Sequence, residues 1–508
     1  MNLEGFRELA ATNQWGLLLP EIFLVALALV LLVFEMIFRR QDVGLVVRLA
    51  LWGQVLLLVL MALGYAGGFP TESKTAFGGL IRQNAETEIM RLFFVVGSLL
   101  ASYLATIYLK RQDLPRTEFF VISLFVTVGL MLLAQSNQFL MLFVALETVT
   151  VGFYVLVAYC RKSAFSLEAG LKYLVLGALS SALLLFGIVL LYGVAGSPEL
   201  SGRVADPLNF QALAGFVSAH RTHPLVLGGT ALVLAGIAFK VGAVPFQIWI
   251  PDVYHGAPTP VAALLAVSSK AAGIFVLLVL VRGPFAGLQE TLVPLLSTVA
   301  VLTILFGNFT ALPQRNVKRL MGLSGIAHAG YLLVGIVAAM TVDWAVYAIL
   351  FYLVAYLLSS FGVFGVMALV AGDDDADQEV DHFEDLGRRE PFLAGVLTVG
   401  LAGLAGIPPL GGFIGKVLLF LAAFQAGLYT LVAVSVAGVV LSIYYYFGWI
   451  REAVFRVWRS PNGENAVGPA TERPVEVSPL DGATLGGLTA LSIGIGVFPT
   501  LAEWLMRL

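Results

Sequence analysis

The chain has 508 residues, of which 59% are hydrophobic and only 12% are charged, with a formal net charge of −3 and a mean hydropathy of +0.92. Because about a quarter of the residues in an ordinary soluble domain are charged, this composition excludes that class. The many long apolar runs predict a polytopic helical membrane protein. The single cysteine, Cys160, excludes an internal disulfide, a cysteine-ligated metal cluster and a CxxC redox pair.

Fourteen membrane spans are expected, so the predicted fold class is an all-α polytopic membrane protein. An N-terminal three-span segment (1–110) precedes two five-span repeats (117–281 and 288–455), and a polar linker leads to the last span (456–508). The spans lie at about 15–38, 44–68, 88–109, 117–135, 137–160, 166–194, 224–254, 259–281, 288–311, 316–340, 342–371, 391–426, 428–455 and 482–506.

The distribution of Lys and Arg predicts the orientation, because cytoplasmic loops carry the excess of positive charge. With the N-terminus outside, 17 of the 29 Lys and Arg residues fall on the inner side and eight on the outer side. Both termini are therefore expected outside. The acidic segment 372–390 is expected on the inner side, as a solvated connector or as a docking surface for a partner subunit. The remaining four basic residues lie within spans: Lys172, Lys240, Lys270 and Lys416.

Charges inside the membrane are the main functional signal, since each costs at least about 2.5–3.5 kcal/mol at mid-bilayer. Lys240 and Lys270 lie too deep to snorkel, whereas Lys172 is close enough to a span end to do so. Glu147 lies near the middle of its span and is the strongest candidate for a buried acid. Burial and a neighbouring carboxylate change proton binding by a lysine in opposite directions, so such a pair can act in a proton relay. His328 can serve as an intermediate carrier or as a hydrogen-bonded core residue.

Two spans contain helix breaks. In "KVGAVPFQIWIPDVYHGAPTP", Gly242 and Pro245 follow Lys240, and in "GLAGIPPLGGFIGKVLLF" Pro408 and Pro409 precede a lysine. Each break falls in the fourth span of a five-span unit, spans 4–8 and 9–13. Since five is odd, consecutive units have opposite topology. Paired interrupted spans predict a transport site between inverted repeats; the alternative is two unrelated proline kinks.

Three stretches of the chain carry a family resemblance: "LKYLVLGALSSALLLFGIVLLYG", "FKVGAVPFQIWIPDVYHGAPTPVAALLAVSSKAAG" and "GLAGIPPLGGFIGKVLLF". They resemble the antiporter-like membrane subunits of respiratory NADH:quinone oxidoreductase, complex I, and in particular the subunit N type, called subunit 2 in mitochondria. The stretch "PDVYHGAPTPV" separates this type from the sister L and M subunits and from the Mrp antiporter subunits. The resemblance covers nearly the whole chain.

The resemblance implies roles for the titratable residues. In the family, an acid of span 5 and a lysine of span 7 form a functional ion pair, and Glu147 and Lys240 match these positions. Gln247 stands where many members have a histidine, which puts a histidine role there in doubt. The other positions that match the family's proton relay are Lys172, Lys270, His328 and Lys416.

The expected function is that of a proton-translocating subunit of complex I in a bacterial cytoplasmic membrane. The family implies that NADH, FMN, Fe–S clusters and quinone are bound by partner subunits and that this chain carries no cofactor. The implied partners are other membrane subunits, of the L, M, K, J, A and H types, and membrane lipid, with no nucleic acid.

Three alternatives remain at this level. The first is a cation/proton antiporter subunit of an Mrp-type complex, and the second is a photosynthetic relative driven by ferredoxin. The third is a scaffold with an inactive channel. Four buried lysines argue against the scaffold, which would gain nothing from their energetic cost.

Overall fold

The computed structural model describes residues 10–505 apart from 39–42, 66–67, 71, 113, 199, 201, 203, 373 and 456–476. Within these residues, thirteen helices are long and apolar enough to cross a membrane. The fourteenth expected crossing, 391–426, consists of two shorter apolar helices. The predicted all-α membrane fold is therefore confirmed, while most of the predicted polar linker lies outside the described residues.

The N-terminal segment contains three long helices and a two-stranded antiparallel hairpin. Thr75 of one strand pairs with Arg82 of the other, and Asn84 caps the helix that follows. The elements are η1 (Trp15–Leu18), α2 (Leu19–Phe38), α3 (Val43–Gly64), β1 (Lys74–Ala76), β2 (Ile81–Gln83) and α4 (Ala85–Arg111).

The first predicted repeat contains a short extra helix, α8, and a π-helical turn, η2. Its elements are α5 (Thr117–Gln135), α6 (Phe139–Val157), α7 (Ala164–Ala195), α8 (Phe210–Ala219), α9 (Pro224–Val241), α10 (Ile250–Gly256), α11 (Thr259–Leu264), η2 (Leu265–Ser269) and α12 (Lys270–Arg282).

The second predicted repeat and the C-terminal part complete the bundle. Their elements are η3 (Ala286–Leu288), α13 (Gln289–Ala311), α14 (Val317–Ala338), α15 (Ala345–Val370), η4 (Val380–Phe383), α16 (Leu386–Arg389), α17 (Pro391–Ala405), α18 (Gly411–Gln425), α19 (Tyr429–Val454), α20 (Pro479–Val497) and α21 (Thr500–Leu505). The division of the chain into domains at the predicted boundaries stays a prediction.

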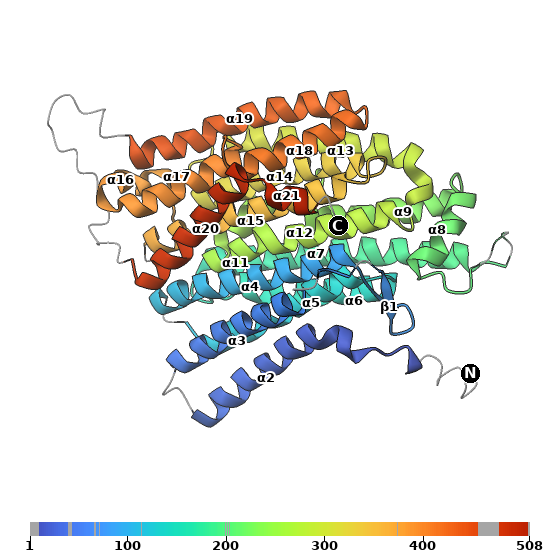
Figure 1. Ribbon diagram of the computed structural model, residues 1–508, viewed down its shortest axis with the longest axis horizontal. Helices are drawn as coiled ribbons and strands as arrows, with labels where there is room; N and C mark the ends of the chain where they lie inside the picture. The colour runs from blue at the N-terminus through green and yellow to red at the C-terminus, as the bar shows by residue number, and fades with distance from the viewer. Residues whose placement is uncertain are drawn as a thin grey trace.

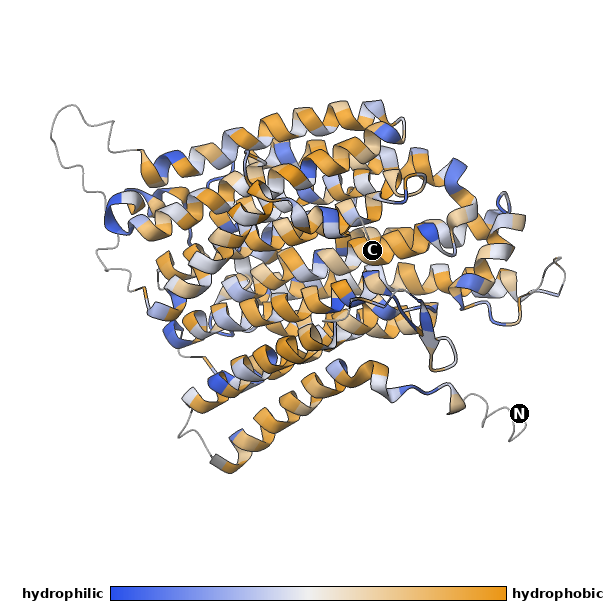
Figure 2. Cartoon of the chain, in the orientation of Figure 1, coloured by the Kyte–Doolittle hydropathy of each residue, from blue (hydrophilic) through white to orange (hydrophobic). Residues whose placement is uncertain are grey.

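The long helices run side by side along the bundle, with β1 and α8 at one end and α16 at the other (Figure 1). Apolar residues cover the sides of the bundle and polar residues gather toward its ends (Figure 2). α14 is buried at every position except Arg319, and α11, α12 and α15 are nearly as buried, whereas α2, α3, α7 and α19 expose apolar side chains. The centre of the bundle is therefore built from elements of both predicted repeats.

Both expected helix breaks are present and share one local structure. Each helix ends at a glycine with positive φ, Gly242 at 79° and Gly406 at 85°, a conformation that favours glycine. In both, the glycine amide donates to the carbonyls three and four residues earlier, and the next amide donates to the carbonyl five residues earlier. Each break also holds a cis peptide at the same offset, Val244–Pro245 and Pro408–Pro409.

The last predicted span, 482–506, is present but shorter, and a separate short helix follows it. α20 ends at Val497 and α21 begins at Thr500, because Pro499 cannot continue the hydrogen bonding of the preceding helix. The hairpin and α8 had no counterpart among the expectations, since both are too short to register in a search for membrane spans.

α7 and α9 pack closely through small residues. A side chain on Gly187 of α7 would meet the backbone of α9, with its Cβ 2.7 Å from both the Gly229 carbonyl oxygen and the Val233 amide nitrogen. Small residues at helix contacts in membranes allow this close backbone approach. The contact fixes α7 against the helix that carries Lys240.

We expect Gly187→Ala to destabilise the protein by about 1–3 kcal/mol, because α7 and α9 must separate to accommodate the methyl group. Thermal unfolding of the purified protein in detergent measures the loss. Gly193→Ala on the same helix is the matched control, since nothing lies within 4 Å of its added Cβ. Equal midpoints for the two variants would contradict the packing argument.

Candidate functional site

Lys240 lies in the last turn of α9, next to the first break, and its side chain is buried. Its Nζ donates to the Tyr173 hydroxyl at 3.2 Å and lies 5.6 Å from the centre of that ring. The Trp249 ring lies 4.8 Å from that of Tyr173, and its indole N–H donates to the Phe239 carbonyl near the end of α9. The Lys240 ammonium group therefore lies next to an aromatic ring and donates a hydrogen bond to the hydroxyl of that ring.

Glu147 does not contact Lys240 in the structure, in contrast to the expected ion pair. The carboxylate is only half-buried and accepts a hydrogen bond from the Ser181 hydroxyl. The physical reason is that α7, which carries both Tyr173 and Ser181, packs between α6 and α9. The acid and the lysine each bind a hydroxyl on the same helix, and no ion pair joins them in the described part of the chain.

Gln247 lies inside the first break and is buried. Its side-chain carbonyl oxygen accepts no hydrogen bond from any described residue. A buried amide oxygen without a protein partner is a place where a water molecule can bind. The Gln247 oxygen is therefore a candidate water-binding position inside the first break.

Lys270 is the first residue of α12, directly after the π-helical turn η2. Turns of this kind locally change the direction of the side chains on a helix. The Lys270 Nζ donates to the Gly325 carbonyl at 2.7 Å and to the Tyr356 hydroxyl at 3.2 Å. The Lys270 side chain, which belongs to the first predicted repeat, therefore contacts α14 and α15 of the second.

His328 occupies the centre of α14 and is hydrogen-bonded through both ring nitrogens. Its Nδ1 lies 2.5 Å from the Tyr352 hydroxyl and its Nε2 lies 3.1 Å from the Tyr446 hydroxyl. Its ring is also 4.9 Å from that of Tyr356, which binds Lys270. The histidine is therefore buried and hydrogen-bonded on both sides, an arrangement that fits either of the two expected roles.

Lys416 follows the second break and reaches back across it. Its Nζ donates to the carbonyls of Leu404 and Ala405, both at 2.8 Å, and lies 5.2 Å from the centre of the Tyr331 ring. The last carbonyls of a helix have no partner within the helix and carry partial negative charge. The C-terminal end of α17 therefore binds this ammonium group in place of a carboxylate.

The two breaks are alike in backbone and different in charge. When Gly242 is aligned with Gly406, Lys416 falls opposite Asp252 and Lys240 opposite Leu404. The predicted asymmetry of the two lysines about their breaks is thus present in the structure.

Lys172 does not belong with the buried lysines, and the expectation of four buried lysines is wrong. Its side chain is 41% exposed and forms ion pairs with Glu168 at 2.7 Å and with Asp252 at 2.6 Å. Asp252, in α10 and outside the candidate spans, also binds Arg319 at 2.8 Å. Burial opposes ionisation of Asp252, but hydrogen bonds from Lys172 and Arg319 outweigh it and lower the pKa of that carboxyl.

A fourth buried lysine, Lys318, was not among the predicted buried residues, because it lies in the first turn of α14 at the edge of a predicted span. Its side chain is fully buried and pairs with Asp375 at 2.7 Å. The Asp375 carboxylate also accepts hydrogen bonds from the Thr259 amide and hydroxyl, at 3.0 and 2.7 Å. Part of the acidic segment is therefore folded onto the start of α11 and is not a solvated connector there.

The tyrosines are the functional candidates that sequence reasoning missed. Tyr173, Tyr356 and Tyr352 bind Lys240, Lys270 and His328 respectively. A signal for two of them exists, because "YLVLGALSS" at 173–181 and "YLVAYLLSS" at 352–360 place a tyrosine at the same position of the third helix in each predicted repeat.

Comparisons with known proteins agree with this arrangement. Residues 136–442 match the family model described as NADH:quinone oxidoreductase/Mrp antiporter, TM. The NADH-quinone oxidoreductase subunit N 1 of Opitutus terrae is 54% identical over all of both chains. A chain in the structure of respiratory complex I from Thermus thermophilus with bound aureothin is 28% identical, with a TM-score of 0.75, covering 95% of this chain and 98% of that one. A chain of the Mrp complex from Dietzia sp. has a TM-score of 0.79 at 20% identity over 96% and 95%, which shows the fold alone.

We expect Lys318→Ala to destabilise the protein by about 3–5 kcal/mol, because it leaves the Asp375 carboxylate buried without a cation. Thermal unfolding measures the loss. Arg315→Ala is the control, since its partner Asp381 lies 3.4 Å away at an exposed site and should matter far less. The double variant Lys318→Met with Asp375→Asn should recover most of the loss, and failure to recover would contradict a charge-based cause.

Proposed function

The chain belongs to the subunit N family of NADH-quinone oxidoreductases, and from this premise we propose that it relays protons across the membrane through its buried lysines and His328. It is an antiporter-like membrane subunit of complex I, and redox chemistry is carried out by other subunits. The single observation that carries the proposal is the arrangement of Lys240, Lys270 and Lys416. Each is buried and bound by neutral oxygens rather than by a carboxylate, so each can exist with or without its proton.

The proposed route starts at the inner side, near the first break, and reaches Lys240. Lys270 follows, since Gly273 of its helix packs against the end of α9. The Tyr356 hydroxyl accepts a hydrogen bond from Lys270, and its ring lies 4.9 Å from that of His328, so we propose that water carries the proton from this hydroxyl to the histidine. The proton then passes to Lys416 and leaves near the second break. Glu147 and Lys172 act on the first part of the route as charges that change the proton affinity of Lys240.

The energy for transport must come from outside this chain. Moving one proton against 100 mV costs about 2.3 kcal/mol. We propose that NADH, FMN, Fe–S clusters and quinone are held by partner subunits and that their reactions supply this energy. The membrane is proposed to be a bacterial cytoplasmic membrane, with both termini on its outer side.

The choice between respiratory subunit and Mrp-type antiporter rests on the degree of similarity. The likeness to subunit N reaches 54% identity over the whole chain, whereas the likeness to the Mrp complex is one of fold. The proposal is therefore a redox-driven proton translocase.

The direct test replaces Lys240 or Glu147 by alanine in the complete complex. Proton translocation driven by NADH in reconstituted vesicles should fall to less than half of the wild-type value, because a relay residue or its charge partner is lost. Lys74→Ala, on the exposed hairpin, is the control and should leave pumping unchanged. Unchanged pumping by a fully assembled Lys240→Ala complex would refute the relay.

A second test addresses the hydroxyl bridges. Tyr352→Phe keeps the ring but removes the oxygen next to His328 Nδ1, so pumping should fall while assembly stays intact. Tyr347→Phe on the same helix, at a partly exposed site, is the matched control. If both variants pump equally well, the tyrosine takes no part in proton transfer.

A further inference from the structure

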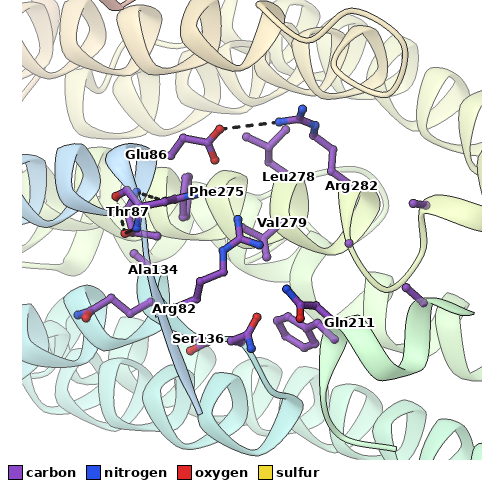
Figure 3. Close-up of a pocket in the computed structure, with 17 residues that line it drawn as sticks. Arg82, Glu86, Thr87, Ala134, Ser136, Gln211, Phe275, Leu278, Val279 and Arg282 are labelled. Atoms are coloured by element: carbon purple, nitrogen blue, oxygen red, sulfur yellow. Dashed lines mark hydrogen bonds and ion pairs between the residues drawn. The ribbon is translucent and has the colours of Figure 1, made fainter. Parts of the chain in front are cut away.

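A pocket of about 590 Å³ lies at the end of the bundle where β1 and α8 lie (Figures 1 and 3). Its wall is formed by β2, the start of α4, the segment that follows α5, α8 and the second half of α12. This volume is within the range of sites that bind small molecules. None of the three central lysines lines the pocket, so it is separate from the proposed relay.

The wall of the pocket carries two arginines and one carboxylate. Arg282 is already paired, with Asp343 at 2.9 Å and with Glu86 at 3.9 Å. Arg82 is partly buried and its side chain extends into the pocket, where it forms no ion pair or hydrogen bond with any described residue (Figure 3). The pocket therefore holds one guanidinium group whose five N–H donors are available to a ligand.

An excess of negative charge lies behind this wall, on the other face of β2. Glu21 and Glu88 are both bound to Arg91, so two carboxylates share one arginine. The Gln83 side chain joins this group through one intervening amide. Because successive residues of a strand point to opposite faces, Arg82 points away from the group, and neither carboxylate forms an ion pair with it. These charges weaken the positive potential of the pocket but supply no ligand atoms to Arg82.

Two neutral side chains of the pocket also have hydrogen bonds to donate. Asn84 caps α4 with its side-chain oxygen, at 3.0 Å from the Thr87 amide, and its NH₂ group has no partner among the described residues. The same holds for the side-chain amide of Gln211 on α8. A guanidinium fork with further donors around it matches an anion that has several acceptor oxygens. Phosphate is such an anion, and arginine is the side chain that recognises it best.

We propose that this pocket binds the phosphate group of an anionic ligand, with Arg82 as the charged contact and Asn84 and Gln211 as further donors. Phe275 and Leu278 of α12 form an apolar side of the pocket, against which the group that carries the phosphate packs. A phospholipid headgroup and a soluble phosphate present the same chemistry to these residues. The proposal does not depend on the relay assignments.

Chemical modification of arginines in the complete, delipidated complex tests the site. Phenylglyoxal is added with and without inorganic phosphate, at an ionic strength equalised with chloride, and peptide mass spectrometry measures the modification of each arginine. Phosphate should slow the modification of Arg82 by about tenfold when its free concentration is about ten times its dissociation constant, because only the empty pocket reacts. Arg221, which is exposed and paired with Glu290 at 3.7 Å, is the internal control and should react at an unchanged rate.

A second arm of the experiment replaces inorganic phosphate with phosphatidylglycerol in detergent micelles. Protection of Arg82 by phosphate alone supports a soluble ligand, and protection by phosphatidylglycerol alone supports a lipid headgroup. Protection by both supports the shared phosphate chemistry. If neither slows the modification of Arg82, or if Arg221 is protected equally, the proposal is wrong.

A variant that fills the pocket without changing its charge completes the test. Ala214 of α8 lines the pocket, so Ala214→Leu should abolish the protection of Arg82 by phosphate. Ala212→Leu is the matched control, because Ala212 is exposed on the same helix, does not line the pocket, and should leave the protection intact. Protection that persists in Ala214→Leu overturns the proposal. Pumping is not the readout, so failure here is distinct from failure of the proposed relay.

Discussion

The arrangement of this bundle depends on how it binds ammonium groups where water is scarce. A lysine in the hydrocarbon region needs oxygen acceptors, and a carboxylate in direct contact favours the charged form of the lysine more strongly than a neutral oxygen does. The central lysines are bound instead by tyrosine hydroxyls and by carbonyl oxygens of the backbone. These acceptors stabilise the charged form moderately and leave the neutral form accessible. The helix breaks, the π-helical turn and the tyrosines can all be understood as ways of supplying such acceptors at the middle of the membrane.

Much of the fold was predictable because the bilayer imposes a simple length and polarity on each span. The breaks were predictable for the same reason, since Gly and Pro stand out in an apolar run. Lys240, Lys270 and Lys416 were found because a charge inside such a run is conspicuous. The tyrosines were missed because an aromatic residue in an apolar helix looks like ordinary core.

Burial near the ends of spans was harder to predict. Lys172 lies within a predicted span yet is partly exposed, and Lys318 lies at a helix start yet is fully buried. The environment of Lys172 depends on α10, which supplies Asp252. The burial of Lys318 depends on the segment around Asp375. Such contacts join residues far apart in the sequence, and hydropathy carries no information about them. The same holds for Arg91, which lies near the start of a predicted span and is buried against Glu21.

The close contact between α7 and α9 has a consequence for timing. The two hydroxyls that bind Glu147 and Lys240 sit on α7, whose backbone is pressed against α9 at Gly187. Sliding these helices would be resisted by tightly packed backbone atoms. Communication between the acid and the lysine is therefore expected to proceed by rotation of side chains and rearrangement of water. Rotamer changes take place in picoseconds to nanoseconds when a side chain is free, whereas collective helix motions take microseconds to milliseconds. We therefore expect the contacts of Glu147 and Lys240 to change faster than a collective helix motion would allow.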